Sequence, residues 1–402
     1  MVRAAFQILA EDGRARSGHI LTPHGIIDTP AYIPVATRGA INTLSHSDLR
    51  TLSVQALITN AYHLHLQPGI ELIREMGGLH RFMGWGTPLL LDSGGFQVLS
   101  LGIAKEKGGG KVSALNSESR KTLGSPSPKT GKNQVVITED GVEFISYRDG
   151  TRHFFSPEKV VQTGLDLGAD IIMVLDECTS PFHDFQATRE AMERTHRWAL
   201  TSLNSFHNTS SNGQVLFGIV QGGAFRELRE ESARFLGRQP FSGFAIGGFL
   251  GGSKQEMLEV LTWTIPHLPR DKPRHFLGIG LVEDIFEMVA QGIDLFDCVA
   301  PTRLAATGTF LCKGTPRFRM RILNEAYKND PRPIEEHCTC LTCRSHSRAF
   351  LRHLFRAKEP LAGYLAAYHN LHFMETLMHQ IRRAIQEKNF AVFKKSWMGA
   401  QG

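Results

Sequence analysis

The stretch Val215-Leu-Phe-Gly-Ile-Val-Gln221-Gly-Gly shows the pattern that decides the fold, because an unbroken apolar run ends abruptly in a polar side chain and two glycines. Near-continuous apolar runs of this length are typical of strands buried on both faces. The same form recurs along the chain, in Pro88-Leu-Leu-Leu-Asp92-Ser-Gly-Gly, Ile171-Ile-Met-Val-Leu-Asp176-Glu, Gly243-Phe-Ala-Ile-Gly-Gly248, His275-Phe-Leu-Gly-Ile-Gly280 and Ile293-Asp-Leu-Phe-Asp297-Cys.

Helix-like segments fill several of the intervals between these runs. One is expected to begin after the capping residue Ser156, with Pro157 at its first position, and another to run from about Asp184 to His207. Alternating strands and helices predict parallel strands joined by crossovers, as in a doubly wound sheet or a (β/α)8 barrel. We predict an α/β fold of the (β/α)8 TIM barrel type. Polar residues end at least six of the strands, and a barrel collects its active site there, whereas an open sheet concentrates its site at one switch point.

Composition narrows the class of protein. The 402 residues are 42% hydrophobic and 21% charged, which is typical of a globular chain and not of a disordered one. No signal-peptide core and no uncharged apolar stretch of about 18 residues is present, so we expect a cytoplasmic protein without a membrane span. Because the cytoplasm is reducing, we do not expect a disulfide framework. The net charge of +6 permits a nucleic-acid partner without establishing one.

Residues 103–133 interrupt the alternation of strand-like and helix-like segments. The segment is rich in Gly, Ser and Lys, and its seven Lys/Arg exceed its two Glu. Such a composition predicts a flexible basic insertion. Gly108-Gly-Gly-Lys111 is not a phosphate loop, because the earlier glycine is missing and Val112 stands where Ser or Thr is needed.

A cysteine cluster follows the barrel pattern and a basic stretch from Lys313 to Arg321. Cys338-Thr-Cys340-Leu-Thr-Cys343 predicts a structural zinc site, since Zn²⁺ takes four N or S ligands when no position is left for water. Spacing leaves several candidates for the fourth ligand, of which His369 lies on a long helical pattern from about Leu361 to Ile385. The candidates are His337, His346, His353, His369 and His372, while Cys178, Cys298 and Cys312 are expected to be core residues.

Asp92, Asp176 and Asp297 each end a strand-like run. One such aspartate alone is better explained as a helix cap or turn former, but three at equivalent positions of one barrel predict a site. Paired carboxylates suit chemistry at an anomeric carbon, where one attacks and the other moves protons. The neighbouring glycines would let backbone approach a flat ligand, with Phe96 stacking on it and Gln221 bonding to its edge. The residues thus predict a glycosyl-transfer barrel with a zinc appendage.

These motifs resemble the signature stretches of the tRNA-guanine transglycosylases. The matching segments are Asp92-Ser-Gly-Gly-Phe-Gln97, Asp176-Glu-Cys, Gly218-Ile-Val-Gln221-Gly-Gly, Ala245-Ile-Gly-Gly248, Phe296-Asp297-Cys-Val-Ala-Pro-Thr-Arg303, and the cysteine cluster with His369 placed 26 residues after Cys343. The resemblance covers nearly the whole chain apart from residues 103–133. It implies a catalytic barrel over residues 1–310, and a zinc-binding subdomain with C-terminal helices packing back on the barrel over residues 311–402.

The resemblance also implies an activity and its partners. The expected reaction exchanges the wobble guanine of tRNAs with a GUN anticodon for a 7-deazaguanine base. Asp297 would be the nucleophile that forms a covalent link to ribose, and Asp92 the general acid/base. A homodimer, or a pair with a related subunit, would bind the tRNA anticodon loop without a redox or nucleotide cofactor.

Further site residues follow from the same motif matches. One structural Zn²⁺ per subunit would be held by Cys338, Cys340, Cys343 and His369. The base would be bound by Ser93, Gly94, Gly95, Phe96, Asp176, Gln221, Gly248, Gly251 and Leu277. The anticodon loop would be met by Gly278, Ile279, Gly280, Leu281, Val282, Glu283 and Asp284, and by Thr302, Arg303, Leu304, Ala305 and Ala306, with Arg303 as the expected base contact.

The resemblance leaves two questions open. The first is the identity of the incoming base. Gly251 favours queuine, because members that use 7-aminomethyl-7-deazaguanine carry a bulkier residue there. Cys178 instead resembles the bacterial pattern, and Leu277, where a methionine is common, is less informative. The basic insertion either binds tRNA phosphate or has no role.

Three rival functions agree less well with these residues. A non-catalytic zinc-containing RNA-binding subunit of the same family would be expected to lose Asp297 or the Asp92 motif. An unrelated glycoside hydrolase leaves the zinc cluster unexplained. A zinc-ribbon RNA-binding module would not need three strand-end aspartates.

Overall fold

The computed structural model describes residues 6–97, 135–209 and 211–399, so the predicted insertion at 103–133 lies outside the described residues. The predicted barrel is confirmed. Eight strands form one sheet in the order β4-β14-β13-β12-β11-β10-β6-β5, and a parallel bridge between Val35 and Ile58 nearly closes it. The strands are β4 (Ala31–Pro34), β5 (Leu57–Asn60), β6 (Leu89–Asp92), β10 (Ile171–Met173), β11 (Val215–Val220), β12 (Gly243–Ile246), β13 (Arg274–Phe276) and β14 (Leu295–Cys298).

The chain divides into two compact units, each of which is described by itself. The first holds the described residues within 60–82 and 90–272, and the second those within 6–59, 83–89 and 273–399. Strand registers are parallel from β6 through β10 and β11 to β12 in the first unit, and from β13 through β14 to β4 in the second. The domain boundary expected near residue 310 stays a prediction.

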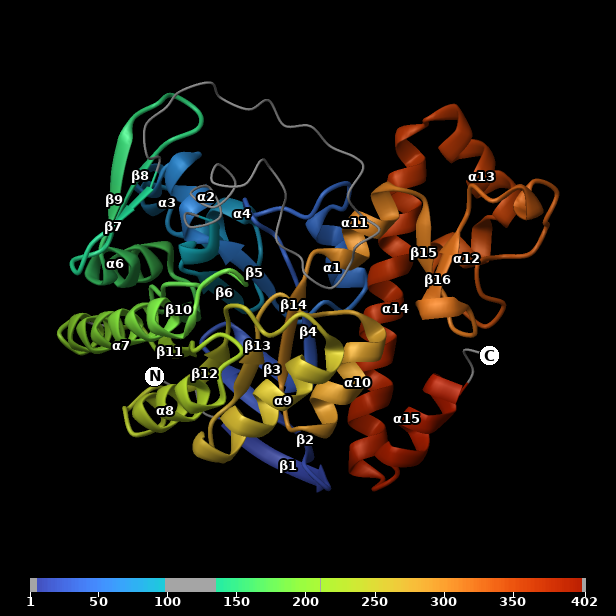
Figure 1. Ribbon diagram of the computed structural model, residues 1–402. Helices are drawn as coiled ribbons and strands as arrows, with labels where there is room; N and C mark the ends of the chain where they lie inside the picture. Colours follow the sequence, from blue (N-terminus) through green and yellow to red (C-terminus); the bar gives the residue numbers. More distant parts are fainter. Residues whose placement is uncertain (1–5, 98–134, 210, 400–402) are drawn as a thin grey trace. The chain divides into compact units, whose positions relative to one another are not determined.

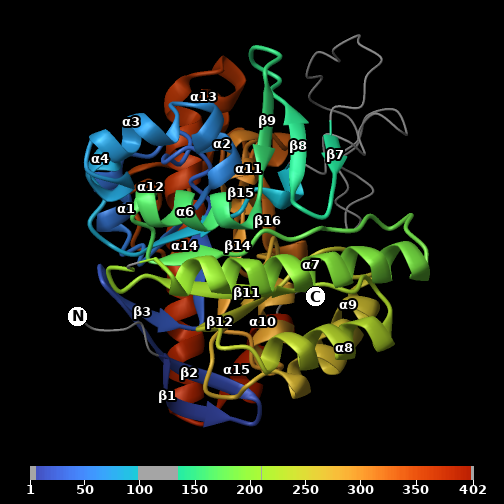
Figure 2. The same ribbon diagram turned by 90° about the vertical axis from the view of Figure 1, so that its left-hand side faces the viewer.

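In the first unit, helices follow the strands as the alternation predicts. Ser156 accepts a hydrogen bond from the Lys159 N–H at the start of α6 (Pro157–Leu167), and Asp184 accepts one from Ala187 at the start of α7 (Phe185–His207), so both predicted starts are confirmed. Figure 1 shows α6, α7 and α8 as neighbours beside β10, β11 and β12, and Figure 2 shows α7 running across the front of the view with α8 below it. The other elements are α2 (Ala61–Leu66), α3 (Ile70–Glu75), α4 (Leu79–Met83), α8 (Arg226–Gly237), α9 (Lys254–Thr264), a 3-10 turn (Ile265–His267), and an antiparallel sheet of β7 (Val135–Ile137), β8 (Val142–Ile145) and β9 (Arg152–Phe155).

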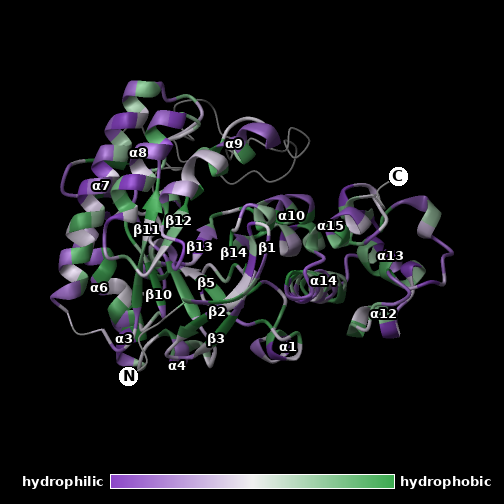
Figure 3. Cartoon of the chain, turned by 90° about the horizontal axis from the view of Figure 1, so that it is seen from below, coloured by the Kyte–Doolittle hydropathy of each residue, from purple (hydrophilic) through white to green (hydrophobic). Residues whose placement is uncertain are grey.

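The strands of this unit are apolar because both of their faces are covered. Every residue of β10, β11 and β12 is buried, and in Figure 3 these strands are green while α7 and α8 carry hydrophilic residues as well. Glycines inside the strands make room for aromatic rings. A Cβ at Gly243 would lie 2.4 Å from the Phe217 ring, and one at Gly218 would lie 2.9 Å from the Phe241 ring. Each buried large apolar side chain contributes about 1.5–3 kcal/mol to folding.

The second unit begins with an antiparallel sheet and ends with a helical region. The long helix α14 (Pro360–Gln386) confirms the predicted helical pattern, and Figure 1 shows it running beside β15 and β16. None of the helices in the described part of the chain is both long enough and apolar enough to cross a membrane. The elements are β1 (Phe6–Asp12), β2 (Ala15–Thr22), β3 (Gly25–Thr29), α1 (His46–Thr51), α10 (Val282–Ala290), α11 (Ala300–Ala306), β15 (Thr309–Leu311), β16 (Arg319–Arg321), α12 (Leu341–Ser345), α13 (Arg348–Ala357) and α15 (Phe390–Met398), with 3-10 turns at Pro316–Phe318 and Glu325–Tyr327.

A buried ion pair joins the N-terminal sheet to the strands of the second unit. Arg16 Nε lies 2.8 Å from Asp294 Oδ1, and its terminal nitrogen lies 2.5 Å from Oδ2. Asp294 Oδ2 also accepts a hydrogen bond from the Arg274 N–H at 2.7 Å. Both side chains are almost fully buried, so removing either partner would leave an uncompensated charge and cost about 3–5 kcal/mol.

Candidate functional site

Asp92 ends β6, and its carboxylate is held by a residue from the neighbouring strand end. The Asn60 amide donates to Asp92 Oδ2 at 2.6 Å and to Gln97 Oε1 at 2.9 Å. Asn60 Oδ1 accepts from the His63 N–H and so caps α2, which orients its NH2 group toward the carboxylate. Sequence reasoning missed Asn60, although it ends the apolar run Leu57–Asn60 just as the aspartates end theirs.

A second polar cluster surrounds Asp176, just beyond β10. Gln221 Nε2 donates to Asp176 Oδ2 at 2.6 Å, the Cys178 thiol lies 3.2 Å from the same oxygen, and Ser93 Oγ lies 3.5 Å from Oδ1. Burial raises the pKa of Asp176, while these three hydrogen bonds act in the opposite direction. Burial and the neighbouring Asp176 also raise the pKa of Cys178 well above its usual value. Cys178 was expected in the core, and it is instead a member of this polar cluster.

Gln221 and Gly248 fit together so closely that a side chain at position 248 would displace the Gln221 amide. Gly248 has φ +80°, and a Cβ there would lie 2.1 Å from Gln221 Oε1. That oxygen is enclosed and has no hydrogen-bond partner within the described residues. Buried acceptors are normally satisfied, so a donor group of a ligand is the natural partner for this oxygen. A Cβ at Gly95 would similarly lie 2.6 Å from the Asp176 carbonyl oxygen.

Arg229 holds the two glycine-rich turns that carry Gln221 and Gly248. Its guanidinium donates to the carbonyl oxygens of Val220 and Gly223 in one turn, at 3.0 and 2.7 Å, and of Gly247 and Phe249 in the other, at 2.9 and 3.0 Å. The side chain is fully buried, which lowers the pKa of Arg229 to about 9. Sequence reasoning missed this residue, because a charge within a helical pattern suggests a solvated face.

The remaining predicted base contacts of the first unit flank these clusters. Phe96 follows Gly95 and is 51% exposed, so its ring is available to stack on a flat ligand. Gly251 lies in the loop after β12 with φ +97°, where a Cβ would be 2.4 Å from the Glu256 Cβ. A larger residue at position 251 would therefore require that loop to rearrange.

In the second unit, Asp297 ends β14 and accepts two hydrogen bonds on one oxygen. His275 Nε2 lies 2.8 Å from Asp297 Oδ1, and the Gly278 N–H donates to the same atom at 3.1 Å. A carboxylate can only accept, so Nε2 carries the imidazole proton. His275 is fully buried, and its Nδ1 has no partner among the described residues. Asp297 Oδ2 has no such partner either, which leaves one carboxylate oxygen free to react.

Contacts with Tyr32 and Gly280 hold the chain just beyond Asp297 in place. The hydroxyl of Tyr32, a fully buried residue of β4, donates to the Cys298 carbonyl oxygen. A Cβ at Gly280 would lie 2.5 Å from the Cys298 Cβ and 3.3 Å from the Tyr32 ring, so glycine allows this turn to pack against β14. Burial raises the pKa of Cys298 to about 11, so this thiol stays protonated near neutral pH.

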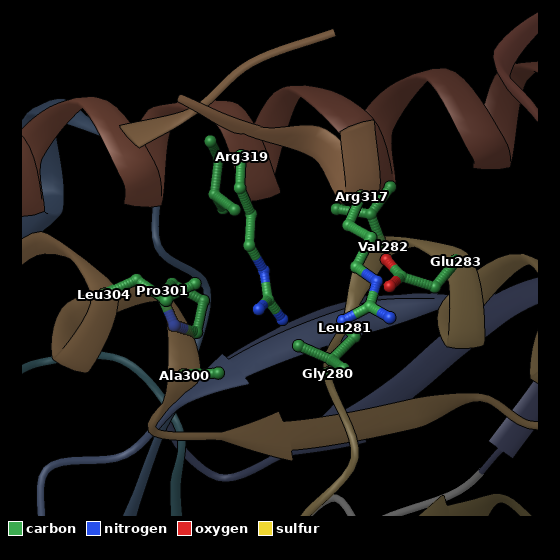
Figure 4. Close-up of a pocket in the computed structure, with 10 residues that line it drawn as sticks. Gly280, Leu281, Val282, Glu283, Ala300, Pro301, Leu304, Arg317 and Arg319 are labelled. Atoms are coloured by element: carbon green, nitrogen blue, oxygen red, sulfur yellow. The ribbon is translucent and has the colours of Figure 1, made fainter. Parts of the chain in front are cut away.

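The two predicted anticodon-loop segments meet in the second unit. Leu277, half-buried, and Gly278, exposed, follow β13, and Ile279 and Gly280 lead into Leu281 and α10 with Val282, Glu283 and Asp284. Thr302, Arg303, Leu304, Ala305 and Ala306 belong to α11, where Arg303 is exposed. Residues of both segments line one pocket, shown in Figure 4.

The four predicted metal ligands come together near the C-terminus. The ligand atoms of Cys338, Cys340, Cys343 and His369 all lie within 4.8 Å of one another. The three sulfurs lie 3.8, 3.5 and 3.3 Å from His369 Nδ1, and tetrahedral zinc would set S and N about 3.5 Å apart. His369 Nε2 donates to the Leu311 carbonyl oxygen at 2.7 Å, so Nδ1 faces the sulfurs with its lone pair. The residues present therefore fit a structural zinc.

Comparison with known proteins agrees with this geometry. A family model described as queuine tRNA-ribosyltransferase matches residues 11–402. A queuine tRNA-ribosyltransferase of a Roseiflexus species is 45% identical over 412 residues, covering 98% of this chain and 99% of the relative. One of Caldanaerobacter subterraneus is 42% identical over 401 residues, covering 99% and 98%. A third, of Desulforudis audaxviator, is 42% identical over 398 residues and covers 98% of each.

Proposed function

The chain belongs to the queuine tRNA-ribosyltransferase family, and we propose that it exchanges the wobble guanine of GUN-anticodon tRNAs for a 7-deazaguanine base through a covalent Asp297–ribose intermediate. The observation that carries the proposal is the state of the Asp297 carboxylate. Oδ1 is held by His275 and Gly278, while Oδ2 has no partner in the described part of the chain. A nucleophile restrained in this way loses little freedom when it attacks.

The proposed reaction has two displacements at the ribose C1′ atom. Asp297 Oδ2 bonds to C1′ as the C1′–N9 bond breaks, and Asp92 gives a proton to the departing guanine. Asp92 then takes the N9 proton of the incoming base, whose N9 attacks C1′ and releases Asp297. Asn60 would hold the Asp92 carboxylate during both transfers, because its amide donates to Oδ2.

Base recognition is assigned to the Asp176 cluster of the first unit. The free Gln221 Oε1 would accept an N–H of the base, while Ser93, Asp176 and the backbone at Gly248 would bind its other polar edges. The glycine pair Gly94-Gly95 lets the backbone come close, and Phe96 would stack on the ring. Leu277, which follows β13 in the second unit, is also assigned to base binding.

We assign queuine as the favoured incoming base, with 7-aminomethyl-7-deazaguanine as the alternative. Support comes from Gly251, which carries no side chain, and whose Cβ position is already blocked by Glu256. A competition assay decides between them by measuring displacement of labelled guanine from tRNA by each base. If only the aminomethyl base displaces guanine, the assignment of queuine is wrong.

Zinc bound by the Cys338 cluster would supply structure and no chemistry, because three thiolates and His369 complete its tetrahedron. The ligand His369 lies on α14, and the cysteines lie at and before α12, so the metal would join these two elements. We further propose that the protein is a homodimer, which light scattering of the zinc-loaded protein tests directly, and that it acts in the cytoplasm.

The decisive experiment traps the covalent intermediate. Incubated with a GUN-anticodon tRNA, the protein should give a protein–RNA adduct that resists denaturation, and Asp297→Ala should give none. Asp92→Asn should keep the fold and stop base exchange. A wild-type protein that binds tRNA but never forms the adduct would instead be the non-catalytic RNA-binding subunit.

A further inference from the structure

The basic hairpin of β15 and β16 supplies two arginines to the pocket that the anticodon-loop segments line. Arg317 and Arg319 form one wall of a small cavity of about 10 Å³ that is partly open to solvent, opposite Gly280–Glu283 and the α11 residues Ala300, Pro301 and Leu304. Figure 4 shows both guanidinium groups directed from the hairpin toward these two segments. Neither guanidinium has an ion-pair or hydrogen-bond partner in the part of the chain that the structure describes.

The backbone at this point keeps the two side chains together. Arg317 and Phe318 have φ of 53° and 55°, a left-handed conformation that non-glycine residues rarely adopt. Phe318 between them is fully buried and packs on Trp397, with ring centroids 5.9 Å apart. Such a conformation persists only when its surroundings enforce it, and here the anchored Phe318 leaves both arginines on the opposite, pocket side.

The polarity and charge of the other lining residues indicate which class of ligand the pocket binds. Leu281, Pro301, Leu304 and Leu311 are apolar, and Glu283 carries the single negative charge of the lining, so two cations face one anion. Unpartnered guanidinium groups bind phosphate through paired N–H donors, and apolar walls suit a ribose or base. The cavity is too small to enclose a nucleotide, so we expect a backbone phosphate to meet the arginines at the pocket mouth while its ribose contacts the apolar rim. Inorganic phosphate would use only the arginines.

We infer that Arg317 and Arg319 bind a backbone phosphate of the RNA substrate and set the position of the anticodon loop over α10 and α11. The inference rests on the proposed function for its partner, since RNA is the substrate proposed above. It extends the contact beyond the segments Gly278–Asp284 and Thr302–Ala306 to the hairpin, and it gives the basic stretch Lys313–Arg321 a role. Phosphate contacts fix position and register without reading sequence.

The test measures binding of an anticodon stem-loop RNA to the zinc-loaded full chain as a function of salt. Arg317→Gln/Arg319→Gln should raise Kd about tenfold. It should also make the slope of log K against log[salt] shallower by about 0.7, the value for one phosphate in a single-stranded region. The charge-preserving pair Arg317→Lys/Arg319→Lys should keep the wild-type slope. Arg356→Gln is the matched control, because Arg356 is exposed on α13 and does not line the pocket.

Substituting one methylphosphonate at a time along the RNA loop identifies the phosphate. One position should weaken binding to wild type and have no further effect on Arg317→Gln/Arg319→Gln. An unchanged slope, an equal loss in Arg356→Gln, or the absence of such a position would overturn the inference. So would saturable binding of inorganic phosphate that the Gln pair abolishes while RNA affinity stays the same.

Failure of the inference and failure of the proposed function give different results. If the Gln pair binds RNA like wild type while adduct formation proceeds, the phosphate contact is wrong and the reaction stands. If wild type forms no adduct but its RNA affinity depends on Arg317 and Arg319, the contact stands and the reaction is wrong. Equal melting temperatures and zinc contents of all variants are required as controls for folding.

Discussion

His275 Nε2 lies 2.8 Å from Oδ1 of Asp297, so a fully buried imidazole holds one oxygen of the proposed nucleophile, while the other has no hydrogen-bond partner among the described residues. Removing this donor should let the carboxylate rotate away from the attacking position. We expect His275→Leu to slow single-turnover adduct formation roughly 10- to 100-fold, since small misplacements of a reacting group have effects of this size.

The matched variant His275→Gln tests the same relationship. Its side-chain NH2 group can take the place of Nε2, so adduct formation should recover most of the lost rate while RNA affinity stays unchanged in both variants. Equal rates in His275→Leu and wild type would show that the hydrogen bond does not position Asp297. A parallel loss in His275→Leu and His275→Gln would point to packing instead.

Gly248→Ala should weaken base binding. The added methyl group would meet Gln221 Oε1 at 2.1 Å, and the backbone there has φ +80°, so Gln221 must move away from Asp176. We expect KM for the incoming base to rise at least tenfold with little change in melting temperature. Gly252→Ala is the control, because its Cβ would meet only the end of the Glu256 side chain, at 3.6 Å. Equal KM values for both variants would contradict the assigned role of Gly248.

Arg229→Met should lower both stability and base affinity, because four carbonyl oxygens of the turns around Gln221 and Gly248 lose the hydrogen bond from Arg229, although that of Val220 keeps one from the Gly247 N–H. Each unsatisfied buried group costs about 1–3 kcal/mol. We expect the melting temperature to fall by several degrees and KM for the base to rise. Arg226→Met, on the exposed side of the same helix, should change neither the melting temperature nor KM. An Arg229→Met variant as stable as wild type would show that Arg229 does not hold the two turns together.

Removing the metal should destabilise the second unit without changing the chemistry directly. Chelation, or Cys340→Ala, should lower the melting temperature and RNA affinity, since zinc binding energy is folding energy. Cobalt substitution offers a readout independent of activity, because four-coordinate ligation by three sulfurs and one nitrogen gives a characteristic absorption spectrum. Full stability of the metal-free protein would contradict a structural role for the Cys338 cluster.

Glu375 predicts a measurable pH dependence of stability. This residue of α14 has an enclosed Oε1 atom without a partner in the described ranges, and burial raises the pKa of Glu375 to about 8. Between about pH 4.5 and 8 the folded state therefore keeps a proton that the unfolded state has lost, so stability falls as pH rises. The melting temperature of Glu375→Gln, relative to wild type, should increase across this range. A constant difference would show that Glu375 ionises normally.

The barrel strands and the three cysteine ligands could be predicted because their signals are local in sequence, whereas His369 was singled out among five histidines only by the family resemblance. Apolar runs with polar ends, such as Val215–Gln221, record burial on both faces, and three cysteines within six residues restrict the possible ligand set. Asn60 could have been found by the same strand-end rule. His275 could not, because it stands at the start of an apolar run and its partner Asp297 is 22 positions away. Arg229 and the Arg317–Arg319 pair depend on backbone geometry that sequence spacing does not reveal.

The buried pair between Arg16 and Asp294 also constrains the order in which the protein can be completed during synthesis. The two residues are 278 positions apart. At about 5–20 residues per second, Arg16 is added to the chain roughly 14–56 seconds before its partner. Until then the buried position of Arg16 lacks its counter-charge, so we expect the N-terminal sheet to pack stably only after Asp294 has been made. A chain that stops before Asp294 would lack the partner of the buried Arg16, so we expect proteases to cleave its N-terminal strands more readily than those of the full chain.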